Sequence, residues 1–241
     1  MKIQFRIVAA VAAVVAVGSM VQAQTFVYQN TGTDTGHNVN LTNGVVIGQE
    51  INLNSANLAT APYLTNFSFE FFSTNASFSG TPQMDLKFYQ NTSASTYHGY
   101  NTPNVLFYDS GWFNLVAPLS FASGNVGTYV FDPTALYTGA GSMLTSLTLP
   151  QDFTVVFTVT GLNSTLNQVG LETFGSPQVG TNYGDFWINN GAWSLQTNNA
   201  GLLGLGMQFN NSPTPAPEPS VIGLGAMGLV MLGQFIRRRK E

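Results

Sequence analysis

The acidic residues are the first group in this chain that could do chemistry, because two opposed carboxyl groups can hydrolyse a glycosidic bond. Residues 24–212 contain nine acidic residues, spread evenly along the chain. Glu172 and Asp185 are the pair best suited to act from opposite sheet positions. Evenly spread acids are, however, typical of residues that only solubilise a domain. A secreted glycoside hydrolase therefore stays an alternative, and we expect that the protein is not an enzyme.

Motifs for a nucleophile, a metal ion or a cofactor do not accompany these acids. The absence of cysteine excludes a thiolate nucleophile, a disulfide framework and a cysteine zinc site. His37 and His98 lack the spacing of zinc-binding histidines, and no G-x-S-x-G sequence occurs. One glycine-containing loop offers oxygen donors to a calcium ion, from Asp34, Asn38 and Asn40. Because only one of these donors is a carboxylate, we expect no bound metal and no cofactor.

Aromatic side chains support a stronger binding hypothesis, since a flat ring can stack on a sugar while nearby amides bind its hydroxyls. Tryptophan in strands is more often part of the core, because each indole buries a large area. The loop "STYHGYNTPN", residues 95–104, is rich in Gly, Asn and Pro, and we expect it at the surface. The possible glycan contacts are Tyr97, Tyr100, Trp112, Trp187 and Trp193. A specific carbohydrate-binding, lectin-like module is thus the first alternative for the function.

Charged residues are scarce and unevenly placed. Only 7% of residues are Asp, Glu, Lys or Arg, where a soluble domain has roughly 25%. Asn, Thr, Ser, Gln and Gly replace them, and this composition favours strands and turns over salt-bridged helices. Lys87 is the only Lys or Arg between residues 24 and 212, so nine carboxylates leave this region with a net charge of −8. Nucleic-acid binding needs clustered Lys and Arg and is therefore not expected.

The elements that must position these residues are strands, because apolar and polar residues alternate with a period of two in several stretches. In "LTNFSFEFF", Phe67, Phe69 and Phe71 alternate with Ser68 and Glu70. The other expected strands are "TFVYQ", "VIGQEINL", "QMDLKFYQ", "NVLFYDSGWFNL", "GTYVFDP", "FTVVFTVTGL", "VGLETF", "GDFWI", "AWSLQ" and "LGLGMQF". No stretch has a sustained helical period. We therefore expect an all-β domain over residues 24–212, an antiparallel β-sandwich of jelly-roll type.

A tight hairpin is expected towards the end of this domain. In "FWINNGAW", the Asn190-Gly191 pair suits the two positive φ angles of a type I′ turn. Trp187 and Trp193 would then flank this tight hairpin.

The N-terminus has the composition of an export signal. Residues 1–23 begin with "MKIQFR", continue with an apolar run and end in small residues, which predicts a signal peptide cleaved after Ala23. The apolar run is shorter than the roughly 20 residues that span a membrane, which disfavours the alternative of an anchor helix. We therefore expect an exported protein.

The C-terminal segment combines a proline-rich linker, residues 213–219, with an apolar helix and a basic tail, residues 220–241. A helix over residues 221–236 would measure roughly 24 Å, against a hydrocarbon core of about 30 Å. Its glycines lower the helix propensity, so we expect it to stay in a membrane only transiently, with a permanent tail anchor as the alternative. Its G-x-G-x-x-G match follows a proline linker instead of a strand, which excludes a nucleotide site.

These C-terminal residues resemble the PEP-CTERM sorting signal. The resemblance rests on Pro217, Glu218 and Pro219, on the apolar glycine-containing helix, and on the terminal Arg237, Arg238 and Arg239. It implies a Gram-negative bacterium that makes exopolysaccharide, and an exosortase-type membrane enzyme that recognises Pro-Glu-Pro and removes the helix and tail. The chain would be held transiently at the inner membrane and then released to the cell surface or the extracellular matrix.

The order of the strand-like stretches also resembles a recurring ectodomain of PEP-CTERM proteins. That resemblance implies an architecture and no biochemical activity. We therefore expect an exported surface or matrix protein with a structural or adhesive role in an exopolysaccharide matrix. Its expected partner outside the cell is an extracellular polysaccharide.

Overall fold

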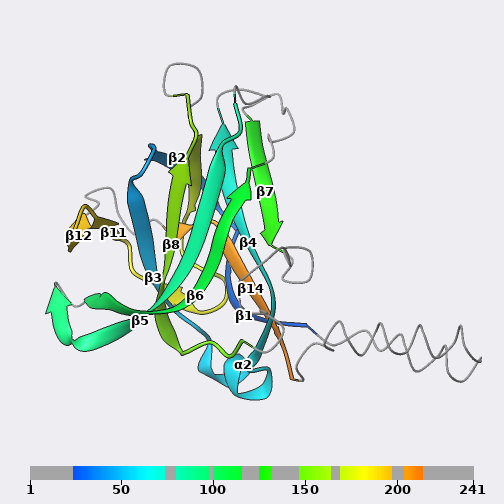
Figure 1. The fold of residues 1–241 in the computed structure, drawn as a ribbon. Coiled ribbons are helices and arrows are strands. Elements are labelled where there is room, and N and C mark those ends of the chain that lie inside the picture. Colours follow the sequence, from blue (N-terminus) through cyan, green and yellow to red (C-terminus); the bar gives the residue numbers. More distant parts are fainter. Residues whose placement is uncertain are drawn as a thin grey trace, which may run out of the picture.

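The structure is a computed structural model, which describes residues 24–73, 80–97, 100–115, 125–131, 147–163, 169–196 and 204–213. Within these residues the chain is almost entirely β, with two antiparallel sheets and one short helix (Figure 1). Several residues with expected roles lie outside the described part, namely Ala23, His98, Pro217, Glu218, Pro219, Arg237, Arg238 and Arg239.

The first sheet, named sheet A, has seven strands. They are β1 (Thr25–Asn30), β2 (Asp34–Leu41), β4 (Tyr63–Ser73), β7 (Asn125–Phe131), β9 (Val169–Phe174), β13 (Gly204–Leu205) and β14 (Met207–Ser212). Their order is β1-β14-β4-β9-β13, with β2 paired to β9 and β7 paired to β4. The first and last strands of the described part are therefore neighbours.

The second sheet, named sheet B, also has seven strands. They are β3 (Val46–Asn52), β5 (Gln83–Tyr97), β6 (Tyr100–Asn114), β8 (Asp152–Thr160), β10 (Thr181–Asn182), β11 (Phe186–Asn189) and β12 (Trp193–Gln196). Their order is β12-β11-β3-β8-β5-β6, with β10 paired to β3. The helix α2 (Ser55–Thr60) follows β3, and Asn54 caps it by accepting a 3.0 Å hydrogen bond from the Asn57 amide.

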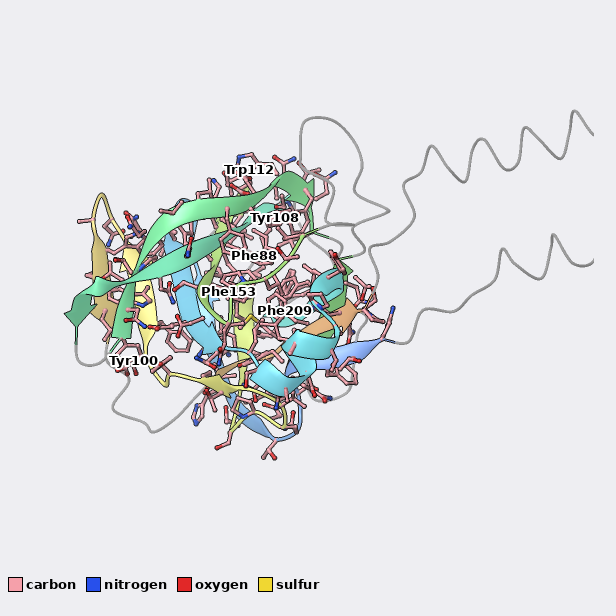
Figure 2. All side chains as sticks on the ribbon, turned by 90° about the horizontal axis from the view of Figure 1, so that it is seen from below. Phe88, Tyr100, Tyr108, Trp112, Phe153 and Phe209 are labelled. Atoms are coloured by element: carbon pink, nitrogen blue, oxygen red, sulfur yellow. The ribbon has the colours of Figure 1, made fainter. Side chains whose placement is uncertain are left out.

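The two sheets pack face to face through aromatic rings, which gives a sandwich-like fold. Phe67 of β4 lies 5.8 Å from Phe88 of β5, between ring centroids, and Phe209 of β14 lies 5.5 Å from Phe153 of β8. All four side chains are fully buried, and Figure 2 shows Phe88, Phe153 and Phe209 close together in the interior. Because aromatic burial dominates core energetics, these rings hold the sheets together and fix which strand faces point outward.

The predicted strands are present, with two corrections. The glycine-containing stretch of Asp34, Asn38 and Asn40, which was expected to be a loop, forms β2, and β2 pairs with β9 through Asn38 opposite Glu172 and Asn40 opposite Gly170. The type I′ hairpin is also corrected, because Asn189 pairs with Trp193 and the loop therefore contains residues 190–192. Gly191, at a φ of 99°, supplies the left-handed conformation that this longer loop needs.

Candidate functional site

The outer face of sheet B gathers the polar and aromatic side chains that could bind a ligand. Phe153 and Phe157 of β8 point into the core, so Asp152 and Thr154 point outward by strand alternation. Ile51 of β3 is a core residue in the same way, which places Glu50 on the outer face. The register confirms the shared face, since Glu50 lies directly opposite Thr154 and Asn52 opposite Asp152.

A hydrogen-bonded pair of carboxyl groups, Glu50 and Asp152, forms the centre of this face. The backbone amide of Asn101 donates to Glu50 Oε2 at 3.0 Å, and its Nδ2 donates to Oε1 at 3.1 Å. Asn91 donates from Nδ2 to Asp152 Oδ1 at 2.5 Å and accepts from Thr154 Oγ1 at 2.7 Å. Strands β3, β5, β6 and β8 therefore each contribute to one polar cluster.

Burial and charge keep one proton on this pair. The side chain of Glu50 is fully buried, and this burial, followed by the neighbouring Asp152, raises the pKa of Glu50 from its usual 4.5 to about 8. A carboxyl group with this pKa is protonated at pH 7, so Glu50 donates the hydrogen bond that joins the two groups. The side chain of Asp152 is half-buried.

Two tyrosines and a further carboxylate lie beside the carboxyl pair. The ring centroids of Tyr100 and Tyr183 are 5.0 Å apart, and the Tyr183 amide donates to the Glu50 carbonyl at 3.4 Å. The side chain of Tyr100 is hydrogen-bonded to Asp185, and burial together with this carboxylate raises the pKa of Tyr100. We name the set the Glu50 cluster, which consists of Glu50, Asn91, Tyr100, Asn101, Asp152, Tyr183 and Asp185.

Sheet B curls around this cluster. In a flat sheet, β12 and β5 would be roughly 19 Å apart, since three strands separate them. The rings of Trp193 on β12 and Tyr89 on β5 are nevertheless 5.5 Å apart in an edge-to-face contact. Figure 1 shows the joined ends of β5 and β6 on the same side of the molecule as β11 and β12. The two hairpins therefore approach each other over the outer face of β3 and β8.

The structure separates the five expected glycan contacts. Tyr100 and Trp193 are half-buried at this curled end of sheet B. Trp112 is 49% exposed at the other end, and Figure 2 shows it well apart from Tyr100. Trp187 is only 2% exposed, so the expectation that its ring contacts a glycan is corrected. Tyr97 ends β5 and pairs through its backbone with Tyr100.

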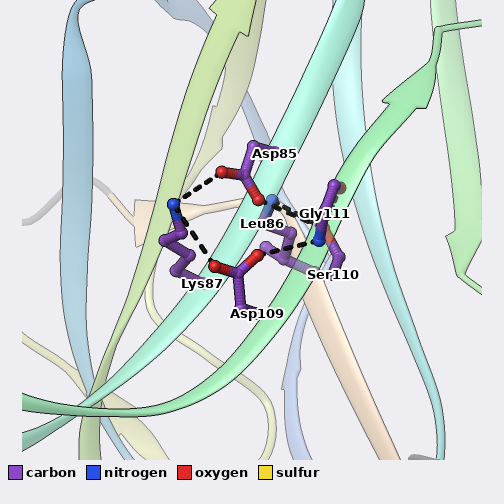
Figure 3. A network of polar contacts seen from close by, with 6 residues as sticks. All are labelled: Asp85, Leu86, Lys87, Asp109, Ser110 and Gly111. Atoms are coloured by element: carbon purple, nitrogen blue, oxygen red, sulfur yellow. Dashed lines mark hydrogen bonds and ion pairs between the residues drawn. The ribbon is translucent and has the colours of Figure 1, made fainter. Parts of the chain in front are cut away.

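The one cation of this region is used elsewhere on the same face. Lys87 Nζ lies 2.7 Å from Asp85 Oδ2 and 3.5 Å from Asp109 Oδ2, as Figure 3 shows. Ser110 Oγ accepts a 2.9 Å hydrogen bond from the Leu86 amide and contacts Asp85 Oδ1 at 3.5 Å. Lys87 is therefore shared between these two carboxylates.

Glu172 and Asp185, the pair named for the hydrolase alternative, lie in or beside different sheets. Glu172 belongs to β9 of sheet A, where burial, then Asp34 and Glu70, raise its pKa to about 7. Asp185 lies beside Tyr100, next to β11 of sheet B. The separation arises because strand pairing places neighbouring segments of the sequence in different sheets.

His37 and Asp34, which were weighed from the sequence as metal ligands, both lie in β2. Among the residues that the structure describes, no group of three or more His, Asp or Glu side chains is arranged to hold a metal ion. His37 lies in β2, where Thr173 Oγ1 donates to its carbonyl at 2.9 Å. Asp34 Oδ1 accepts a 2.8 Å hydrogen bond from the Gly36 amide.

Sequence reasoning missed Glu50, Asp152, Asn91, Asn101 and Tyr183. The one local signal was the acidic residue within the apolar strand "VIGQEINL", since a carboxyl group beside buried positions needs a partner. Its partner could not be read from the sequence, because Asp152 belongs to a distant strand.

Comparison of the chain with protein-family models, with curated protein sequences and with solved structures found no match. In the described part, no helix has both the length and the apolar character that crossing a membrane requires.

Proposed function

We propose that this chain is an exported surface or matrix protein with a structural or adhesive role in an exopolysaccharide matrix. The observation that carries the proposal is the outer face of sheet B. Half-buried or exposed rings of Tyr100, Trp112, Tyr183 and Trp193 occur there beside amide and carboxyl groups. Sugar recognition uses this combination, because rings contact the apolar faces of a sugar while polar groups bind its hydroxyls.

The proposal includes the route by which the protein reaches the matrix. A signal peptide ending at Ala23 would start export from a Gram-negative cell, and the PEP-CTERM-like segment would hold the chain at the inner membrane. An exosortase-type enzyme would then cut near Pro217, Glu218 and Pro219. The support for this route is the order of the linker, the apolar segment and the arginine cluster in the sequence.

We also propose that the sandwich is of jelly-roll type. Its support is that strands distant in sequence are neighbours in both sheets, as in β1 with β14 and β3 with β8. Such long connections are typical of Greek-key and jelly-roll sandwiches.

The carboxyl pair is better suited to binding than to glycoside hydrolysis. Retaining glycosidases hold their two carboxyl groups roughly 5 Å apart, and inverting ones hold them further apart. Glu50 and Asp152 share a direct hydrogen bond, which leaves no space between them for a sugar carbon or a water. We therefore propose that the protein is not a hydrolase, which an assay for released reducing sugar would check.

The proposal is tested on protein recovered from the matrix of its producing cells. We expect the protein in the polysaccharide fraction, with an intact mass that lacks the apolar segment and the basic tail. An intact mass that still includes Arg237–Glu241 would show that the processing step is wrong. Absence of the protein from the surface and polysaccharide fractions would overturn the matrix function.

A further inference from the structure

The sequence contains two Asn-Gly pairs, Asn43–Gly44 and Asn190–Gly191, and such a pair can react with itself. The amide nitrogen of the glycine attacks Cγ of the asparagine, and the missing Cβ of glycine leaves this approach open. A C–N bond forms, the bond from Cγ to Nδ2 breaks, and ammonia leaves. Water then opens the resulting succinimide ring to aspartate or isoaspartate. No enzyme and no further reagent is needed.

The two pairs are alike in backbone conformation and in exposure. Gly44 has a φ of 78° and Gly191 has a φ of 99°, and both lie in tight turns. Both asparagines and both glycines are exposed, so water reaches each pair. A difference in reactivity between the pairs must therefore come from the hydrogen bonds that hold the reacting groups.

The turn after β8 holds both reacting groups of the first pair. Asn43 Nδ2 donates to the Leu162 carbonyl at 2.7 Å, and Asn43 Oδ1 accepts from the Leu162 amide at 2.8 Å. The Gly44 amide, which would be the nucleophile, donates to the Val159 carbonyl at 2.9 Å. The side chain of Asn43 must break its two hydrogen bonds before it can turn towards the Gly44 nitrogen, and that nitrogen must break a third.

The second pair lies in the exposed loop between β11 and β12 and is held more weakly. The Gly191 amide donates to Asn189 Oδ1 at 2.9 Å, which is a local contact at the tip of the hairpin. No hydrogen bond joins the Asn190 side chain to another residue of the described part. The carboxamide of Asn190 can therefore turn towards the Gly191 nitrogen while the sheets stay intact.

We propose that Asn190 is a site of spontaneous covalent modification, which converts to aspartate and isoaspartate in the folded protein while the fold protects Asn43. The conversion adds a carboxylate to the hairpin, and isoaspartate inserts one backbone carbon into the loop that joins Asn189 to its partner Trp193. Because the Trp193 ring contacts Tyr89, the product loosens the hairpin beside the candidate site. This inference goes beyond the proposed function and does not depend on it.

The test follows both asparagines by peptide mapping and mass spectrometry in the purified protein. One sample is kept folded at pH 8 and a second is kept unfolded in urea, until the unfolded chain has converted at both positions. We expect Asn43 in the folded protein to convert about tenfold more slowly than Asn190, or slower still, because two more hydrogen bonds must break. In urea the two rates should be similar, since the fold alone distinguishes the pairs. Equal rates in the folded protein, or no conversion of folded Asn190, would overturn the inference.

The variant Asn190→Gln tests the consequence for the hairpin. Glutamine would have to form a six-membered ring, which closes far more slowly, so the variant keeps its side chain over the same incubation. We expect the backbone amides of β12 to exchange with deuterium faster in the aged unaltered protein than in the aged variant. Equal exchange after Asn190 has converted would show that the modification leaves the hairpin unchanged and would overturn this part of the inference.

Discussion

Glu50 occupies an outward position of β3 and is nevertheless fully buried, because Asn101 at the start of β6 covers it and donates two hydrogen bonds to it. A carboxyl group in this position is stabilised in its protonated form, as its pKa of about 8 indicates. The unfolded chain holds this proton only below the usual value of 4.5. Between these two values the folded state binds more protons than the unfolded state, so stability falls as pH rises.

This proton gives a prediction for the variant Glu50→Gln. Glutamine keeps the shape and the acceptor oxygen but does not ionise. We expect thermal unfolding of the unaltered protein to lose several degrees between pH 5 and pH 8, since one pKa unit corresponds to about 1.4 kcal/mol. The variant should lose clearly less over the same range.

A part of the pH dependence should persist in Glu50→Gln. Glu172, with a pKa of about 7, and Glu70, whose pKa burial also raises, act in the same direction from sheet A. The loss of stability above pH 7 therefore distinguishes the contribution of Glu50 from those of Glu172 and Glu70. Identical melting temperatures for variant and unaltered protein at each pH would show that Glu50 is ionised in the folded state.

For single residues, the sequence predicted which side chains lie in strands better than it predicted how exposed each side chain is. Trp112 and Trp187 both follow the alternating pattern of a strand, yet one is 49% exposed and the other 2%. The difference arises because Trp187 lies on the outer face where the sheet curls, whereas Trp112 lies on β6 at the edge of the sheet. Curling of a sheet depends on contacts between distant strands, and no local pattern contains that information.

Among the elements, the β11–β12 hairpin is the part whose position affects the candidate site most. Its contact with β5 is the edge-to-face pair of Trp193 and Tyr89. Removing that pair by Trp193→Ala should loosen β12, because such pairs contribute beyond their buried area. We expect the backbone amides of β12 to exchange with deuterium roughly threefold to tenfold faster, measured by hydrogen exchange. Trp112→Ala is the control, and equally fast exchange in both variants would contradict a specific contact.

The turn after β8 gives a second prediction for the elements. Gly161 has a φ of 71°, and a Cβ added there would lie 2.8 Å from the carbonyl oxygen of Thr81. Gly44 has a similar φ of 78° with open space around it, so Gly44→Ala is the matched control. We expect Gly44→Ala to destabilise by about 1 kcal/mol from backbone strain alone, and Gly161→Ala by about 2 to 3 kcal/mol. Urea unfolding measures both, and equal losses would contradict the close approach of Thr81.

The positions of most strands were predictable because apolar and polar residues alternate along each of them, as Phe67, Phe69 and Phe71 show in β4. The strand β2 was not predictable, because its Gly, Asn and Thr residues are also typical of a loop. It forms a strand through its pairing with β9. The hairpin at Asn190-Gly191 was placed correctly, and its loop is one residue longer than expected. Local residue preference does not decide between the two lengths, because the register with β3 and β12 does.

For the whole molecule, the decisive property is an acidic domain with few charges. Lys87, the only Lys or Arg between residues 24 and 212, is held by Asp85 and Asp109, and the nine acidic residues of that region give it a net charge of −8. A net negative charge opposes binding to nucleic acid and to acidic polysaccharide. The composition alone predicted the low and negative charge of the domain. Locating the candidate site on sheet B required the fold.

The central claim is that this molecule adheres to an extracellular polysaccharide through the curled end of sheet B. The most direct measurement is sedimentation of the secreted protein with purified polysaccharide of its producing cells, across a series of salt concentrations. We compare the unaltered protein with a folded Tyr100→Ala, Tyr183→Ala double variant. The account predicts that the unaltered protein is retained, with retention falling moderately at high salt, and that the double variant is lost. Equal sedimentation of both proteins, or of neither, would contradict it.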